Sequence, residues 1–407
     1  MSLISVEDAL DRLLAPVVRL ESETVSLTEA GGRILAEPIV ARRTHPPFDG
    51  SAMDGYAVRA QDVATVPAQL RVIGESAAGR RFAGRVGKAE AVRIFTGAPV
   101  PEGADTILIQ ENATPAGPGL IDVDETVAPH KHIRRAGLDF REGDVLLDKN
   151  GLIDPAALAL IAAADIAEVP VVRRPLVAVL ATGDELVAPG SVRTEDQIVA
   201  SNSYGIGEMV RLCGGLVLDL GIVADDEKAI GAALSKAQGA GADIIVTLGG
   251  ASVGDHDLVG KVFQDAGVAL SFWKITMRPG KPLMAGRLGN IHVLGLPGNP
   301  VSSLVCGHLF LRPLLARLQG LSHDTPLDRA RLTSPLPQND HRQDYIRAVV
   351  TRGTDGMLSA APLSVQDSSM LSGLARANSL IVRKPNAEAA EIGAETEIIV
   401  LRTPRSP

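Results

Sequence analysis

Two loops of small residues, each after a short apolar run, are the parts of this sequence best suited to bind an anion. Gly249 and Gly250 follow the apolar residues 244–248, and a Pro-Gly-Asn-Pro motif at 297–300 follows the apolar residues 291–296. Glycine allows backbone N–H groups to approach an anion closely, and a helix that begins at Pro300 would leave N–H groups of its first turn free. The spacing therefore predicts a site for a phosphate or another oxyanion.

Three cationic side chains, Lys274, Arg278 and Lys281, lie between these two loops. They strengthen the prediction, because a bound phosphate or oxyanion is stabilised by both positive charge and hydrogen-bond donors. The alternative is that the glycines and prolines only turn the chain and that the cations are solvated. Finding both loops and all three cations within one stretch, residues 242–306, favours the anion site.

Carboxylates follow several of the predicted strands. Glu185, Asp225 and Asp257 each come shortly after an apolar, strand-like run. From residue 175 onward the pattern of strand, loop and helix repeats, which predicts a parallel sheet whose strands end at one common edge. Carboxylates beside phosphate loops are typical of sites where Mg²⁺ bridges to phosphate oxygens, so we expect these three acids to bind that metal. The alternative for any single acid is a helix N-cap, which would suit Asp225 or Asp226.

A second unusual stretch runs from residue 45 to residue 58 and contains the sequence Ser-Ala-Met-Asp-Gly-Tyr-Ala at 51–57. Its Asp54-Gly55 step could form only a hairpin turn into the next strand. Alternatively, so irregular a loop could hold Asp54 at a functional site. Thr96, in a turn after another predicted strand, carries a hydroxyl that is free to bind a ligand.

The composition limits the class of protein. The chain has 407 residues, which predicts about two to four domains. Hydrophobic residues make up 45% and aromatic residues only 3%, so small aliphatic side chains must fill the cores. The net charge of −8 argues against nonspecific nucleic-acid binding. The two cysteines make no disulfide framework, which fits a reducing cytosol, and we expect neither a signal peptide nor a membrane span.

Hydrophobic periodicity divides the chain into regions of different character. Two helices are predicted to begin at the N-cap residues Ser5 and Asp154. Short strands separated by glycine and proline predict two β-rich regions, at 56–127 and at 323–407. An α/β region is predicted between them, from residue 175 onward.

Seven motifs, taken in order, resemble a known family. They are SAMDGYA at 51–57, TGAP at 96–99, TGDEL at 182–186, GGASVG at 249–254, PGKP at 279–282, LPGNP at 296–300 and LARAN at 374–378. Over nearly the whole length the chain resembles the molybdopterin molybdenumtransferase family, which includes MoeA and the E domain of gephyrin. The sequence has no GxxxxGK[ST] motif, so ordinary P-loop nucleotide hydrolysis is not expected.

This resemblance implies a multidomain α/β and β fold and an elongated homodimer. Its parts would be an N-terminal extended segment at 1–44 plus 141–172, an inserted β-rich domain at 45–140, a central doubly wound α/β molybdopterin-binding domain at 173–322 and a small C-terminal β-barrel-like domain at 323–407.

The resemblance also implies a late step of molybdenum-cofactor biosynthesis. Molybdate would be inserted into the dithiolene of adenylylated molybdopterin, with Mg²⁺-dependent release of AMP. The enzyme would be a cytoplasmic homodimer with a shared active site, and its partners would be the adenylyltransferase and molybdoenzyme acceptors, with no nucleic acid or membrane. One alternative is the adenylyltransferase itself, because the TGDEL, GGASVG and PGNP motifs would also fit it; another is a non-catalytic scaffold of the gephyrin type. The SAMDGYA stretch and the flanking β regions favour the molybdenumtransferase.

The family's functional residues match positions of this chain one by one. The functional acids match Asp54, Asp139, Glu185, Asp225 and Asp257. Polar or cationic groups expected to bind substrate match Thr96, Lys274, Arg278, Arg347 and Ser368, together with Gly249, Gly250, Ser252, Lys281, Pro297, Gly298, Asn299, Pro300 and Ser302. Two departures put the anion geometry in question: Arg278 stands where lysine is common, and Gln366-Asp367 precede Ser368 where glycine is frequent.

Overall fold

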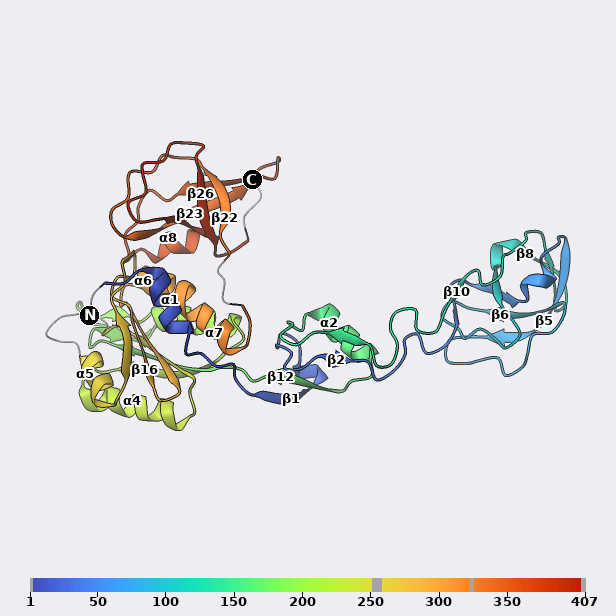
Figure 1. The fold of residues 1–407 in the computed structure, drawn as a ribbon, viewed down its shortest axis with the longest axis horizontal. Helices are drawn as coiled ribbons and strands as arrows, with labels where there is room; N and C mark the ends of the chain where they lie inside the picture. Colours follow the sequence, from blue (N-terminus) through green and yellow to red (C-terminus); the bar gives the residue numbers. More distant parts are fainter. Residues whose placement is uncertain (1–2, 251–257, 323–325, 404–407) are drawn as a thin grey trace. The chain divides into compact units, whose positions relative to one another are not determined.

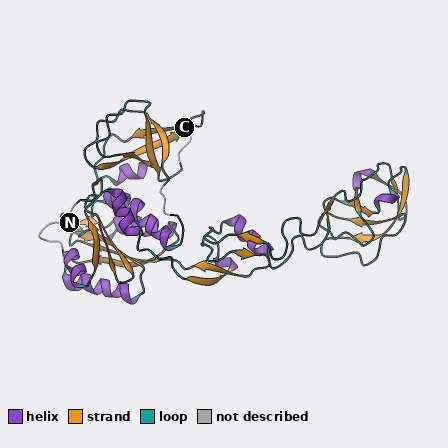
Figure 2. Cartoon of the chain, in the orientation of Figure 1, coloured by secondary structure: helices purple, strands orange, loops and turns teal. Residues whose placement is uncertain are grey.

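The computed structural model describes residues 3–250, 258–322 and 326–403, which form two compact units. One unit, residues 24–171, is rich in β-strands. The other unit, from the described residues of 1–23 and 172–407, contains an α/β layer and a closed β-barrel. Figure 1 shows the course of the chain, and Figure 2 shows where its helices and strands lie. The finer division into four parts, with its boundaries, stays a prediction.

A six-stranded mixed sheet forms the centre of the α/β layer, in the order β16-β13-β17-β21-β20-β18. The strands are β13 (Leu176–Thr182), β16 (Leu216–Val223), β17 (Ile244–Leu248), β18 (Ala269–Trp273), β20 (Met284–Leu288) and β21 (Ile291–Leu296). The first four strands in the order are parallel, and β20 is antiparallel to both of its neighbours, so β18 runs in the same direction as β21. The carboxyl ends of five of these strands therefore lie at the same edge of the sheet.

The side chains of the central strands alternate between two hydrophobic cores, as the pleat requires. Val177 and Val179 of β13 point into one core, and Ala178 and Leu180 point into the other. The first core receives α1 (Val6–Leu14), α3 (Asn202–Leu212), α6 (Pro300–Cys306) and α7 (Arg312–Leu318), and the second receives α4 (Glu227–Gly239) and α5 (Leu258–Asp265). Helices on both faces confirm the doubly wound prediction.

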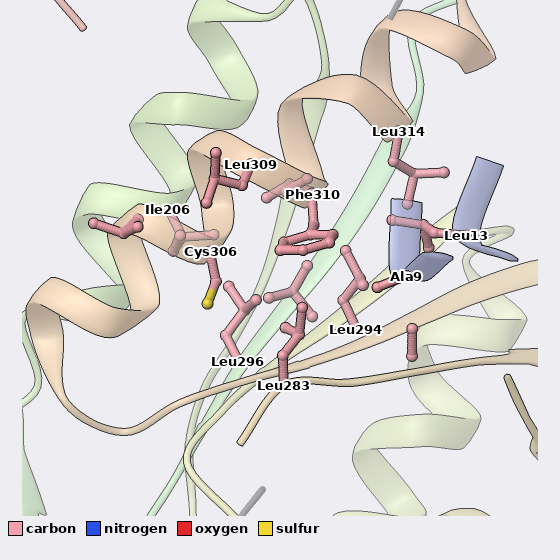
Figure 3. Packing of buried hydrophobic residues seen from close by; sticks show 14 of the residues in the cluster. Ala9, Leu13, Ile206, Leu283, Leu294, Leu296, Cys306, Leu309, Phe310 and Leu314 are labelled. Carbon is pink, nitrogen blue, oxygen red and sulfur yellow. The ribbon is translucent and has the colours of Figure 1, made fainter. Parts of the chain in front are cut away.

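The helical stretch Pro300–Leu318 is the one helix among the described residues with the length and composition of a membrane span. However, 72% of the apolar 18-residue segment within this stretch is buried inside the protein. Phe310 and Leu314 from this stretch lie in the first core with Leu294 of β21 and Leu13 of α1 (Figure 3). Its apolar composition is therefore that of a core helix in the α/β layer.

The C-terminal region folds into a barrel. Its strands are β22 (Asp328–Leu332), β23 (Gln343–Arg352), β24 (Leu358–Pro362), β25 (Ser379–Arg383) and β26 (Glu395–Val400). Pairing of β23 with both β24 and β25 closes these five strands, and the short helix α8 (Leu371–Arg376) lies between β24 and β25 in the chain. The two-residue strand β19 (Met277–Arg278) pairs with β23 and so joins the α/β layer to the barrel.

The β-rich unit is built on a second six-stranded sheet, in the order β7-β4-β6-β5-β9-β8. The strands are β4 (Gly55–Val58), β5 (Ala68–Ser76), β6 (Glu90–Ile94), β7 (Thr106–Ile109), β8 (Ala113–Gly117) and β9 (Leu120–Val123). The same unit contains α2 (Pro155–Ala163), and its predicted N-cap is confirmed, because the Asp154 side chain accepts a hydrogen bond of 2.8 Å from the backbone N–H of Ala157. Ser5 caps α1 in the same way.

Candidate functional site

The loops that carry most of the predicted functional residues meet at one edge of the central sheet. These loops begin at Gly183, Ala224, Gly249 and Pro297 after the four parallel strands, and Lys274 follows β18. The backbone N–H of Asp225 donates to Asp184 Oδ1 over 3.2 Å, and the N–H of Gly249 donates to the carbonyl of Leu296 over 3.2 Å. The loops after β13 and β16 are thus hydrogen-bonded to each other, and the glycine loop is bonded to the end of β21.

Acidic side chains concentrate after β13 and β16. Asp226 is the N-cap of α4, and its side chain accepts hydrogen bonds from two backbone N–H groups of the first turn. Asp225 has a raised pKa, first because it is partly buried and then because of the negative charges of Asp184 and Glu185. The N-cap alternative therefore holds for Asp226, whereas Asp225 is placed where a cation would be stabilised.

Gly249 and Gly250 adopt left-handed backbone conformations, with φ of +99° and +65°. A Cβ atom at Gly249 would lie 2.7 Å from the carbonyl oxygen of Thr182, and one at Gly250 would lie 2.2 Å from Cγ2 of Val259. No side chain fits at either position, so the loop can present only its backbone to a ligand. The buried Thr182 hydroxyl beside these glycines has no hydrogen-bond partner within the described part of the chain.

The Pro-Gly-Asn-Pro loop is tied to the barrel region by Ser368. The side-chain amide of Asn299 donates to the Ser368 hydroxyl over 3.1 Å, and the backbone N–H of Val301 donates to the Ser368 carbonyl over 3.1 Å. Ser302, in the first turn of α6, is 5% exposed. The Ser368 carbonyl therefore accepts a hydrogen bond from an N–H group at the start of α6. The sequence pattern predicts that this N–H group is free to bind an anion.

Arg347 in β23 supports the loop that carries Ser368. This arginine is 1% exposed, and its guanidinium donates to the Asp367 carbonyl (2.8 Å) and to Gln366 Oε1 (3.2 Å). The Gln366 side chain also accepts from the backbone N–H of Arg347 and donates to its carbonyl, both over 3.0 Å. The Gln366 side chain thus forms hydrogen bonds with β23 as the backbone of a neighbouring strand would. These bonds order the loop although no glycine precedes Ser368.

The three predicted cations have different surroundings. Arg278 forms ion pairs with Asp344 and, over 3.4 Å, with Asp340. Lys281 is exposed, and Lys274 is half-buried with a left-handed φ of +72°. Arg278 is therefore neither free nor simply solvated, because two acids from the barrel region orient its guanidinium.

One pocket brings two of the predicted residues together. Arg278 and Arg347 line a cavity of about 640 Å³, and Asp344 and Gln366 lie in the same wall. The cavity is lined by apolar and hydrogen-bonding side chains, and both guanidinium groups in its lining already have acceptors within the protein.

Asp54 and Thr96 contact each other in the β-rich unit. Asp54 Oδ1 accepts hydrogen bonds from the backbone N–H (2.7 Å) and the hydroxyl (2.8 Å) of Thr96. These two bonds hold the pKa of Asp54 below its ordinary value, and the charge of Arg93 lowers it further. The hairpin-turn alternative for Asp54-Gly55 is wrong, because β3 (Gly50–Ser51) pairs with β10 (Ile133–Arg134) and β4 pairs with β6 and β7.

Some predicted residues are not joined to these contacts. Ser252 and Asp257 lie outside the described residues. Asp139 is exposed in the β-rich unit, and no hydrogen bond among the described residues links it to the Asp54–Thr96 pair. Within the described ranges, no three His, Cys, Asp or Glu side chains are placed to hold a metal ion. Metal binding by Glu185, Asp225 and Asp257 therefore stays a prediction.

Sequence reasoning missed Asp184 and Arg93, and it treated Gln366 only as a departure. Asp184 could have been found, because it immediately precedes Glu185 in a loop already singled out. Arg93 and Gln366 act through contacts with residues distant in the chain or on a paired strand, and no local pattern indicates such contacts.

Comparison with known proteins covers almost all of the chain. Three family models match: the MoeA N-terminal region (domain I and II) at residues 4–164, a probable molybdopterin binding domain at 178–317 and the MoeA C-terminal region (domain IV) at 329–401. The chain is 38% identical to the molybdopterin molybdenumtransferase of Haemophilus influenzae, over 91% of this chain and 92% of that one. It is 32% identical to that of Bacillus subtilis, over 98% and 94%. A crystal structure of the molybdopterin biosynthesis MoeA protein from Pyrococcus horikosii matches with a TM-score of 0.85 and 29% identity, over 99% of this chain and all of that one.

The substitution Gln366→Ala tests the role of this side chain. It removes the partner of the Arg347 backbone and leaves a buried guanidinium with one acceptor fewer, which should destabilise the region by about 1–3 kcal/mol. Hydrogen–deuterium exchange of the β23 amides, Arg347 above all, should become faster. The control Glu395→Gln breaks only an exposed ion pair with Arg329 in the same barrel and should leave exchange in β23 unchanged. Equal exchange in Gln366→Ala and the wild type would contradict this role.

Proposed function

The chain belongs to the molybdopterin molybdenumtransferase (MoeA) family, and we propose that it inserts molybdate into the dithiolene of adenylylated molybdopterin with release of AMP. Membership of this family makes it a transferase of molybdenum-cofactor biosynthesis. One observation carries the detailed proposal: acids, glycine loops and Lys274 meet at a single edge of the central sheet.

The charges of the substrates decide what the site must provide. Adenylylated molybdopterin carries several phosphoryl groups, and molybdate is a tetrahedral dianion. Backbone N–H groups and cationic side chains that are already in place stabilise such anions with little reorganisation. Gly249, Gly250 and Lys274 offer these groups at the sheet edge, so we assign the phosphoryl groups of the substrate to this edge.

Mg²⁺ fits the acidic part of the edge. The raised pKa of Asp225 shows that burial and the repulsion from Asp184 and Glu185 disfavour its ionised form, and a divalent cation would reverse this effect. Proteins commonly hold Mg²⁺ through one or two carboxylates, with substrate phosphate oxygens and water as the other ligands. Glu185 and Asp225 would hold it here, with Asp257 from outside the described residues. The ion would supply positive charge that neutralises the phosphate of AMP as it leaves.

We assign molybdate to the cavity lined by Arg278 and Arg347. Asp344 and Asp340 orient the planar fork of Arg278, which keeps that guanidinium in place before an oxyanion binds. Arg347 has its hydrogen bonds directed to Gln366 and Asp367, so its first role is to order the loop that carries Ser368.

A homodimer with a shared active site would account for functional residues in two separate units. In this proposal the loop with Asp54 and Thr96 of one subunit reaches the sheet edge of the other subunit. The adenylyltransferase would supply the substrate in the cytoplasm, and molybdoenzymes would receive the product.

Release of AMP from adenylylated molybdopterin, with and without molybdate, tests the proposed function. The wild type should release AMP in a reaction that needs molybdate and Mg²⁺. Asp225→Asn and Glu185→Gln should slow the reaction about 10- to 100-fold, because each removes charge from the predicted metal site. Glu208→Gln, on the exposed face of α3, makes the same change of charge elsewhere and should have no effect.

Two results would contradict this account. Unchanged rates in both Asp225→Asn and Glu185→Gln would reject the assignment of these acids. Release of pyrophosphate from ATP with free molybdopterin, and no AMP release, would indicate the adenylyltransferase instead.

Mixed dimers test whether the active site is shared. Asp54→Asn and Glu185→Gln chains should each be nearly inactive alone. When the two are co-expressed, half of the dimers are mixed, and each mixed dimer has one site free of both substitutions, so the rate should recover to about one quarter of the wild type. If both residues acted within one chain, the mixture would be no more active than the two variants alone.

A further inference from the structure

An arginine that the proposed function does not use lies beside the Asp54–Thr96 pair. Arg93 belongs to β6, and it stands opposite Tyr56 in the pairing of β4 with β6. Its guanidinium carbon lies over two aromatic rings, 5.0 Å from the ring centre of Tyr56 and 5.1 Å from that of Phe95. These two cation–π contacts help to hold the guanidinium in place.

The hydrogen bonds of Arg93 connect the segments that hold Asp54. One nitrogen of its guanidinium makes a long contact of 3.4 Å with the carbonyl of Gly55, and the other donates to Gln110 Oε1 over 2.8 Å. The backbone N–H of Gln110 donates in turn to the carbonyl of Asp54 over 3.1 Å. Arg93 therefore connects the start of β4, the end of β6 and the residue that follows β7.

Close packing at Gly55 fixes the position of the backbone that Arg93 contacts. A Cβ atom at Gly55 would lie 2.0 Å from the carbonyl oxygen of Leu108, so β4 approaches β7 more closely than any other residue would permit. The carbonyl that Arg93 contacts thus belongs to a backbone position fixed by strand packing, directly after Asp54.

The charged neighbours of Arg93 include Glu75, which stands beside it in the pairing of β5 with β6 and is itself ion-paired with Arg80. None of the ion pairs within the described ranges includes Arg93, whereas Arg71, on the neighbouring strand β5, is paired with Glu90. A guanidinium favours the ionised form of a carboxylate near it. Arg93 does lower the pKa of Asp54, in addition to the two hydrogen bonds from Thr96.

We propose that Arg93 is a positioning residue for the reaction, which holds the backbone that carries Asp54 so that the Asp54 carboxylate stays in contact with Thr96. It does so through its contacts with the rings of Tyr56 and Phe95, with the Gly55 carbonyl and with Gln110. This inference rests on the proposed function, in which Asp54 acts at the active site. In this role Arg93 touches no substrate; it acts through the backbone beside Asp54 and so through the position of the Asp54 carboxylate.

The test compares Arg93→Gln and Arg93→Lys with the control Arg71→Gln. The titration of Asp54 is followed by ¹³C NMR of aspartate-labelled protein, and its signal is identified as the one missing from Asp54→Asn. We expect the pKa of Asp54 to rise in Arg93→Gln, to stay close to the wild type in Arg93→Lys, where the charge is kept, and to be unchanged in Arg71→Gln. This readout needs no catalytic activity, so it remains decisive even if the proposed function is wrong.

The kinetics of AMP release complete the test. In Arg93→Gln, kcat should fall about 10- to 100-fold while the KM for adenylylated molybdopterin changes little. The reason is that a misplaced active-site group weakens stabilisation of the transition state more than it weakens substrate binding. Arg93→Lys should lose part of this rate, because lysine has no planar group to stack. Arg71→Gln should match the wild type.

Two outcomes would overturn the proposal. One is a folded Arg93→Gln protein with an unchanged pKa of Asp54 and an unchanged kcat. The other is an equal loss of rate in Arg93→Gln and Arg71→Gln with lowered thermal stability in both, which would reveal only a general effect on the sheet.

Discussion

The parallel register of β13, β16, β17 and β21 is the constraint on which the candidate site depends. Parallel strands deliver their carboxyl ends to one edge, and in this chain those ends carry a carboxylate loop, a second carboxylate loop, a glycine loop and the Pro-Gly-Asn-Pro loop. The hydrophobic cores on both faces fix this register, because a slip by one residue would move Val177 and Val179 into the wrong core. Packing of small aliphatic side chains thus decides where the functional groups meet.

Acids and a glycine loop occur together at this edge of the sheet. Asp225 is held near two other acids, and the glycine loop can offer only backbone groups beside them. Positive charge is supplied from elsewhere: by Lys274 after β18, and by Arg278, which acids of the barrel region orient. The barrel also provides Ser368, which binds the Pro-Gly-Asn-Pro loop and is ordered through Gln366 and Arg347. The α/β layer and the barrel are therefore in contact at the segments that carry predicted functional residues.

Local patterns in the sequence were sufficient to predict these helices and strands and the edge of the sheet at which the parallel strands end. The runs at 244–248 and 291–296 are buried strands, Asp154 and Ser5 are helix caps, and the alternation after residue 175 is a doubly wound layer. Contacts between distant residues could not be predicted. Arg278 contacts Asp344 only because β19 pairs with β23, and Gln366 contacts Arg347 only because β24 pairs with β23 and the chain continues alongside β23. Each depends on tertiary pairing, which sequence periodicity does not encode.

The most direct test of the central claim is to locate a divalent cation by its anomalous scattering. Crystals of the protein grown with AMP and Mn²⁺, as a substitute for Mg²⁺, would be measured near the manganese absorption edge. The account predicts one strong peak at the carboxyl edge of the central sheet, bound by the carboxylates of Glu185 and Asp225 and by the phosphate of AMP. A peak elsewhere in the protein, or AMP bound at this edge without any metal, would contradict it.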